Sequence, residues 1–151
     1  MRVQLGPIVI DLIDEWADVT DDLTDESEPP LTLARQSADA CGSLQFSFAI
    51  YKGGWLPNPS PDMLADLLRE FGEKAGLVTA GEKHVESQPM RLAAETFRDG
   101  NFVIRAWYVS DGSSVAKITY TAGVADEFAV ELAECEQMVR TIRFPRVGGA
   151  A

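Results

Sequence analysis

Two Asp-Gly dipeptides, Asp99-Gly100 and Asp111-Gly112, constrain the fold of this chain more than any other feature. Each lies between runs rich in β-branched and aromatic residues, and Asp-Gly is strongly favoured in two-residue hairpin turns because it tolerates positive φ. The pattern predicts three consecutive antiparallel strands, over residues 90–97, 102–109 and 115–122.

Two amphipathic segments accompany this predicted meander. Ser60, Pro61 and Asp62 favour a helix start through capping, a fixed φ and the helix dipole, so we expect a helix over 60–75. A second apolar stripe predicts a helix over 126–140.

The central strand, 102–109, is apolar on both faces except at Arg105, and such a strand needs cover on both faces. Arg105 either pairs with an acid across the sheet or lines a pocket, and we expect the pairing, since nearly buried charges are normally partnered. The sequence therefore predicts the α+β class, with an antiparallel β-sheet flanked by helices on both faces, an αβα sandwich.

The remaining segments have weaker patterns. We expect a strand within 3–13, a helical turn or two around residues 16–23, a hairpin from 31–35 and 44–51, a connection over 77–88 and a last strand at 141–144. The chain is interpreted as a single domain over 1–144 with a flexible C-terminal tail over 145–151.

Composition narrows the function. The chain has 151 residues and a net charge of -11, which argues against a nucleic-acid partner and against an anionic membrane surface. It has no apolar run of membrane-spanning length and no signal-peptide pattern, so we expect a cytoplasmic protein. In that compartment Cys41 and Cys135 are expected to be free thiols, with Cys135 acting as a small hydrophobe on the predicted second helix.

Motifs of catalysis and metal binding are missing from the sequence. His84 is the single histidine and the cysteines are far apart, which is too few ligands for a zinc site and gives no recognisable catalytic dyad or triad. No phosphate-binding loop occurs. We therefore expect a non-catalytic protein without cofactor or metal, and a position for His84 in a surface loop.

Two features qualify as a binding surface. Acidic residues crowd between positions 11 and 28, and no Lys or Arg occurs between Arg2 and Arg35. This segment is either a solvated acidic face or a docking surface for a basic protein partner. Its candidate contact residues are Trp16, Asp18, Asp21, Asp22 and Asp25.

The second feature is the Gly- and Pro-rich loop KGGWLPNPSP after Tyr51, which carries Trp55. Tryptophan in such a loop is either an interface anchor or a residue that folds back onto the sheet. Tyr51 and Trp16 have the same two interpretations, and all three are included as candidate partner-binding residues.

Several segments resemble the PsbP-like fold superfamily. They are the DEWADVT segment, the LQFSFAIY strand, the proline-flanked helix start, and the stretch WYVSDG…ITYT…ELAECEQMVRTIRF, which carries most of the resemblance. That superfamily includes the PsbP subunit of photosystem II, the Ran-binding Mog protein, DcrB lipoproteins and small bacterial proteins found beside secreted toxins. The resemblance implies the αβα sandwich and a role in binding rather than catalysis.

Three functional hypotheses follow. The first is a cytoplasmic immunity-type protein that binds and neutralises a basic toxin through its acidic surface. The second is a chaperone or adaptor for a secreted effector. The third is a small-ligand-binding or enzymatic protein with a pocket in the sheet.

Overall fold

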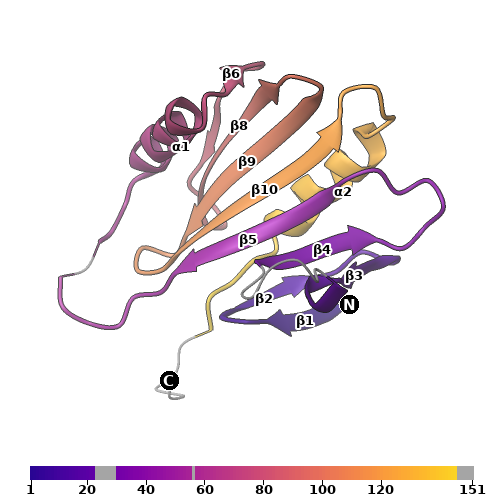
Figure 1. Cartoon of the computed structure of the whole chain (residues 1–151). Helices are drawn as coiled ribbons and strands as arrows, with labels where there is room; N and C mark the ends of the chain where they lie inside the picture. Colours follow the sequence, from indigo (N-terminus) through magenta and orange to yellow (C-terminus); the bar gives the residue numbers. More distant parts are fainter. Residues whose placement is uncertain (23–29, 56, 146–151) are drawn as a thin grey trace.

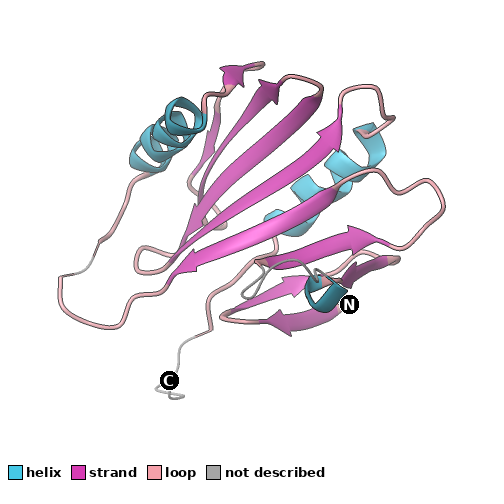
Figure 2. Cartoon of the chain, in the orientation of Figure 1, coloured by secondary structure: helices cyan, strands magenta, loops and turns pink. Residues whose placement is uncertain are grey.

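The computed structural model describes residues 1–22, 30–55 and 57–145. This part of the chain is an α+β structure with an eight-stranded antiparallel sheet, two α-helices and a separate two-stranded sheet (Figures 1 and 2). The strands are β1 (Arg2–Leu5), β2 (Ile8–Asp11), β3 (Trp16–Asp18), β4 (Leu31–Arg35), β5 (Ser43–Ala49), β6 (Val78–Thr79), β7 (His84–Glu86), β8 (Arg91–Asp99), β9 (Phe102–Ser110) and β10 (Val115–Gly123); the helices are α1 (Pro61–Ala75) and α2 (Ala129–Val139).

The predicted meander is confirmed as β8, β9 and β10, and it forms the middle of the main sheet. The strand order is β3-β4-β5-β10-β9-β8-β6, and β7 also pairs with β8. Gly100 and Gly112 adopt positive φ angles of 57° and 100° in the two connections. The loops differ from the predicted two-residue Asp-Gly turns, since Asp99 is the last residue of β8, the first loop consists of Gly100 and Asn101, and the second spans residues 111–114. The hairpin of β4 and β5 is confirmed too, and it extends the meander beyond β10.

Helix α1 begins and ends as its sequence predicts. The Ser60 hydroxyl accepts the backbone N–H of Met63 at 3.2 Å, and Pro61 is the first helical residue. Gly76 ends the helix in the left-handed conformation, with φ 69°, and its N–H bonds back to carbonyls of the last turn. Helix α2 covers the middle of the predicted 126–140 segment.

The strand expected within 3–13 is confirmed as β2, but a second strand was missed: residues 2–11 form a hairpin, because Gly6 with φ 56° turns the chain before Pro7. Three other predictions of local structure are wrong. Residues 16–22 form β3 and a 3-10 turn instead of helical turns, and the expected connection after α1 contains β6 and β7. The expected last strand is reduced to one bridge between Val9 and Arg143. The predicted tail beyond residue 145 lies outside the described residues.

Alternation along the strands divides the core into two clusters. Buried side chains such as Trp107, Ile118 and Tyr120 pack with Met138 of α2, while α1 packs against the alternate positions. The smaller cluster consists of Leu64, Ala65, Leu68, Ala93, Phe97 and Ala106. Helix α1 approaches closely because Gly72 has no side chain: a Cβ there would lie 2.5 Å from the Phe97 ring.

The expected cover on both faces of the sheet is only partly present. Helix α1 contacts β7, β8 and β9, and it leaves the same face of β5 and β10 uncovered. The residues on this uncovered area, which we call the open face, are Gln45, Ser47, Lys117, Thr119 and Thr121. The sequence explains part of the boundary: β8 buries consecutive residues from Leu92 to Glu95, and β9 is apolar at both alternate sets of positions except at Arg105, whereas β5 and β10 are polar at one of them.

Candidate functional site

The loop that carries Trp55 is attached at both ends to the turn between β9 and β10. The backbone N–H of Tyr51 donates to Oγ of Ser114 at 3.0 Å, and the N–H of Asn58 donates to the carbonyl of Gly112 at 2.9 Å. Arg91 adds a further bond from Nη1 to Oδ1 of Asn58, at 2.6 Å. The two ends of the loop are therefore fixed to the sheet.

Between these ends the loop projects Trp55 into solvent. The Trp55 side chain is 94% exposed, and Tyr51, at 36% exposed, donates its hydroxyl to the carbonyl of Gly54 at 2.8 Å. Gly53 and Gly54 have φ angles of 126° and 87°, which side-chain-bearing residues rarely adopt. Of the two interpretations of Trp55, the structure favours the exposed one, in which it does not fold back onto the sheet.

The acidic segment is described only in part. Asp18 and Asp21 are exposed, and the Asp18 carboxylate accepts the backbone N–H of Thr20 at 2.9 Å. Asp22 lies in the 3-10 turn, and Asp25 lies outside the described residues. Of the acidic candidates, Asp18 and Asp21 are therefore the two whose exposure the structure describes.

Trp16 is buried, which disagrees with its proposed role as a contact residue. It is 5% exposed within the larger core cluster, and its indole N–H donates to Oε1 of Glu134 in α2 at 3.1 Å. The residue-by-residue alternation of β3 points it inward, so Trp16 anchors this edge strand to α2 and offers no free surface.

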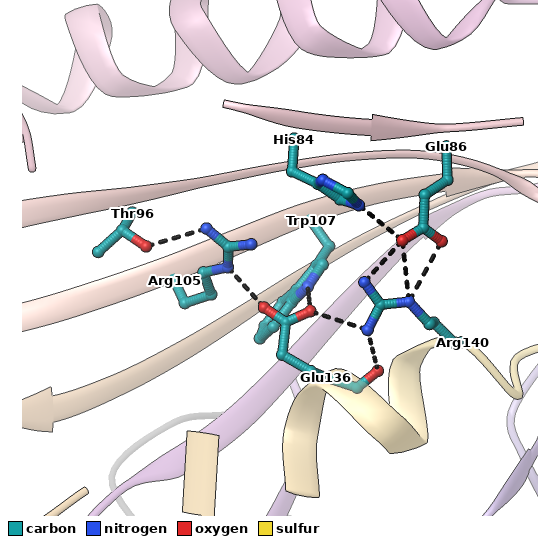
Figure 3. A network of polar contacts seen from close by, with 7 residues as sticks. All are labelled: His84, Glu86, Thr96, Arg105, Trp107, Glu136 and Arg140. Carbon is teal, nitrogen blue, oxygen red and sulfur yellow. Dashed lines mark hydrogen bonds and ion pairs between the residues drawn. The ribbon is translucent and has the colours of Figure 1, made fainter. Parts of the chain in front are cut away.

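A chain of ion pairs and hydrogen bonds connects β7 to the end of α2 (Figure 3). The His84 ring lies 2.6 Å from Glu86, and Arg140 donates to both carboxylate oxygens of Glu86, from Nη2 at 2.7 Å and from Nε at 3.0 and 3.2 Å. These bonds hold the pKa of Glu86 below its ordinary value, and the same interaction raises the pKa of Arg140. His84 is exposed, as predicted, but it lies on an edge strand and not in a loop.

Glu136 continues the same chain of contacts inward (Figure 3). Its carboxylate accepts Nε of Arg105 at 2.7 Å, the indole N–H of Trp107 at 3.2 Å and Nη1 of Arg140 at 3.3 Å. Arg105 also donates to the Thr96 hydroxyl at 3.0 Å. The predicted pairing of Arg105 with an acid is confirmed, and the acid comes from α2.

A fully buried carboxylate, Glu131, fixes the β4–β5 connection. It is 1% exposed, and it accepts the backbone N–H groups of Cys41 and Gly42 at 2.9 and 3.0 Å and the Tyr120 hydroxyl at 2.8 Å. Burial and this carboxylate raise the pKa of Tyr120. Both cysteines are free thiols, and burial raises the pKa of Cys135, so Cys135 is a structural residue as expected.

Two neighbouring hollows lie on the open face beside α1. The first, of about 450 Å³, is lined by residues that include Leu67, Tyr108 and Lys117. The second, of about 340 Å³, extends over Gln45 and Thr121. Both hollows include Phe71 and Lys117, so they adjoin at these two side chains, and we call the pair of hollows the groove. Burial and the neighbouring Glu70 carboxylate raise the pKa of Tyr108.

Sequence reasoning missed the buried carboxylates and the groove. The polar alternate positions of β5, Gln45 and Ser47, were the available signal for an uncovered face. Within the described ranges, no group of three or more His, Cys, Asp or Glu side chains is placed to hold a metal ion. No helix of those ranges is long and apolar enough to cross a membrane.

Comparisons with known proteins place the chain in a structural class. No protein-family model matches the sequence, and a search of curated proteins finds no match. The fold is similar to a crystal structure of a protein from Bacteroides thetaiotaomicron, with a TM-score of 0.55 and 12% sequence identity. The match covers 94% of this chain and 46% of that one, so the chain spans about half of that protein. The likeness shows an antiparallel α+β fold with a bacterial structural relative.

Proposed function

We propose that this protein is a non-catalytic protein-binding module of the PsbP-like αβα type, in which Trp55 anchors the partner. The observation that carries the proposal is the 94% exposure of Trp55 on a loop with both ends fixed to the β9–β10 turn. Tryptophan is enriched among residues that dominate binding energy, because its large rigid side chain gains contact area at little entropic cost. Fixed loop ends reduce the ordering cost further.

The partner that fits this chain best is basic. The net charge is -11, and Asp18 and Asp21 are exposed on the acidic segment that also contains Asp22 and Asp25. Charge complementarity accelerates association and orients the partners. We therefore propose a cytoplasmic immunity-type role, in which the acidic surface meets a basic toxin and Trp55 fills an apolar pocket on it.

A chaperone or adaptor for a secreted effector is the second candidate. The groove along α1 favours it, since an uncovered sheet face beside a helix suits an extended or helical segment of another chain. The third candidate, a small-ligand-binding or enzymatic protein, would use the same hollows, with Tyr108 as their polar group of raised pKa.

Co-expression with candidate basic toxins tests the proposal. We expect the intact chain to restore growth and to form a complex in size-exclusion chromatography. Trp55→Ser should weaken the measured Kd at least tenfold, the loss typical of an interface hot spot. Phe102→Ser, at a 51% exposed aromatic outside the loop, is the matched control and should change the Kd less than twofold.

Two outcomes contradict this function. If the chain neither rescues growth nor forms a complex with any toxin tested, the immunity role is wrong. If a complex forms and Trp55→Ser binds as tightly as Phe102→Ser, the loop is not the anchor.

A further inference from the structure

The groove beside α1 has two chemically different walls. On the helix side lie Leu67, which is 38% exposed, and the partly buried Phe71. On the sheet side, the strands present mostly the polar side chains of the open face, Gln45, Ser47, Thr119 and Thr121, together with Phe46, Ile104 and Tyr108. An occupant that matches both walls must itself be amphipathic, with apolar side chains toward α1 and polar groups toward the sheet.

The charges in the groove oppose the charge of the whole molecule. Lys74 and Lys117 line the same hollow, and Glu70 is the acidic residue among its lining side chains. Within the described part of the chain, neither lysine forms a salt bridge, and the Lys117 ammonium instead lies 4.9 Å from the centre of the Phe71 ring. In a chain of net charge -11, this groove has a local excess of cations over anions.

We propose that this groove binds a segment of a partner protein in which a carboxylate side chain is flanked by apolar residues. The apolar residues contact Leu67 and Phe71, and the carboxylate lies between Lys74 and Lys117. We choose a carboxylate because of charge complementarity. A cation beside an aromatic ring and an apolar wall is only partly hydrated, so it attracts an anion more strongly than a free surface lysine does.

The groove favours a peptide segment over a free amphiphile such as a fatty acid. Both hollows are open to solvent along one side, whereas small apolar ligands are normally enclosed. The proposal goes beyond the binding role of the Trp55 loop, since Trp55 does not line either hollow. If Trp55→Ser abolished the toxin interaction, the proposal for the groove would be unaffected.

Two synthetic peptides test the inference. They share one pattern of leucines, and one carries glutamate and the other lysine at the polar positions. Titrated into the ¹⁵N-labelled full chain, the glutamate peptide should shift amides around Phe71, Lys117 and Thr119 and should bind more tightly than the lysine peptide. Added salt should weaken this binding, because the hollows are open to solvent and salt screens attraction between exposed charges.

Matched variants locate the site. Lys117→Gln should weaken binding of the glutamate peptide about threefold to tenfold, the range for close charge pairs. Lys83→Gln, with the same charge change beyond the opposite flank of α1, should alter it less than twofold. Leu67→Asn should also weaken binding, whereas Val78→Asn, at another exposed apolar residue, should not.

Several results would overturn the inference. Tighter binding of the lysine peptide, equal effects of Lys117→Gln and Lys83→Gln, or no binding of the glutamate peptide at millimolar concentration each contradict it. Concentration-dependent sedimentation of the chain alone, with shifts confined to the groove, would show that a second copy occupies it instead.

Discussion

The two faces of the main sheet differ in how they treat polar groups. The face toward α2, which we call the closed face, buries Glu131 completely and surrounds Glu136 with the indole and guanidinium donors of Trp107 and Arg105. The open face carries polar side chains too, but hollows lie over them and α1 stops short of β5 and β10. Polar residues on the closed face hold the fold together, and those on the open face are available to a partner.

This difference shows that a charged residue in an amphipathic helix does not always lie on the surface of the protein. Helix α2 turns Glu131, Cys135 and Met138 toward the sheet, and the carboxylate is accommodated because three donors converge on it. Removing a single partner from such an arrangement leaves the others buried and unpaired. Equivalent substitutions on the two faces should therefore change the free energy of unfolding by different amounts.

Glu136→Ala should give the largest effect. It removes the acceptor of Arg105 and Trp107, which stay in the core, so we expect a loss of about 2–3 kcal/mol in the free energy of unfolding. Urea unfolding followed by circular dichroism measures this loss. Glu70→Ala, at a carboxylate beside the open face, is the control and should change stability by less than about 0.5 kcal/mol. Equal losses would mean that the faces do not differ.

Neighbouring positions on one strand give a second, smaller contrast. Ile118 is fully buried on the closed face opposite Phe46 and Trp107, whereas Thr119 points to the open face. Ile118→Thr should destabilise the protein by about 2 kcal/mol, because it buries a hydroxyl and leaves a small cavity. Thr119→Ile should remain within about 0.5 kcal/mol of the natural chain. A large loss from Thr119→Ile would indicate that the open face is covered in solution.

Much of this arrangement was predictable from the sequence. The Asp-Gly turns gave the meander, Ser60 and Pro61 gave the start of α1, and alternation in β5 separated Gln45 and Ser47 from the apolar side. These features depend on local backbone preferences and on side-chain period, which a sequence displays directly. The general position of Arg105 beside an acid followed from the cost of burying a charge.

The rest depends on tertiary contacts that no local pattern records. Strands β6 and β7 have two and three residues, too short for alternation to be read, and they exist because β8 offers them an edge. Trp16 has helical spacing to its neighbours, but pairing with β4 overrides it. The sequence alone does not determine whether Trp55 is exposed, since this exposure depends on how Ser114 and Gly112 hold the ends of the loop.

A third test concerns the stability that Glu86 contributes at the partly exposed edge of the closed face. Arg140 lowers the pKa of this carboxyl below its ordinary value of 4.5, so the folded state favours the ionised form. The resulting stability is fully present above pH 4.5 and is lost as the pH falls through the lowered pKa of the folded state. Glu86→Gln should therefore cost about 1 kcal/mol at pH 7, where both Arg140 and the carboxylate are charged.

The difference in stability between the natural chain and Glu86→Gln should shrink toward zero in acid, and urea unfolding from pH 7 down to pH 3 measures it. The charged and ionisable groups around Glu86 are Glu136, Arg140, Arg105 and His84, and all four are present in both proteins. Glu73→Gln, at an exposed carboxylate of α1, should show no such dependence on pH. A difference that stays the same from pH 7 to pH 3 would mean that Glu86 stabilises β7 through packing and not through its charge.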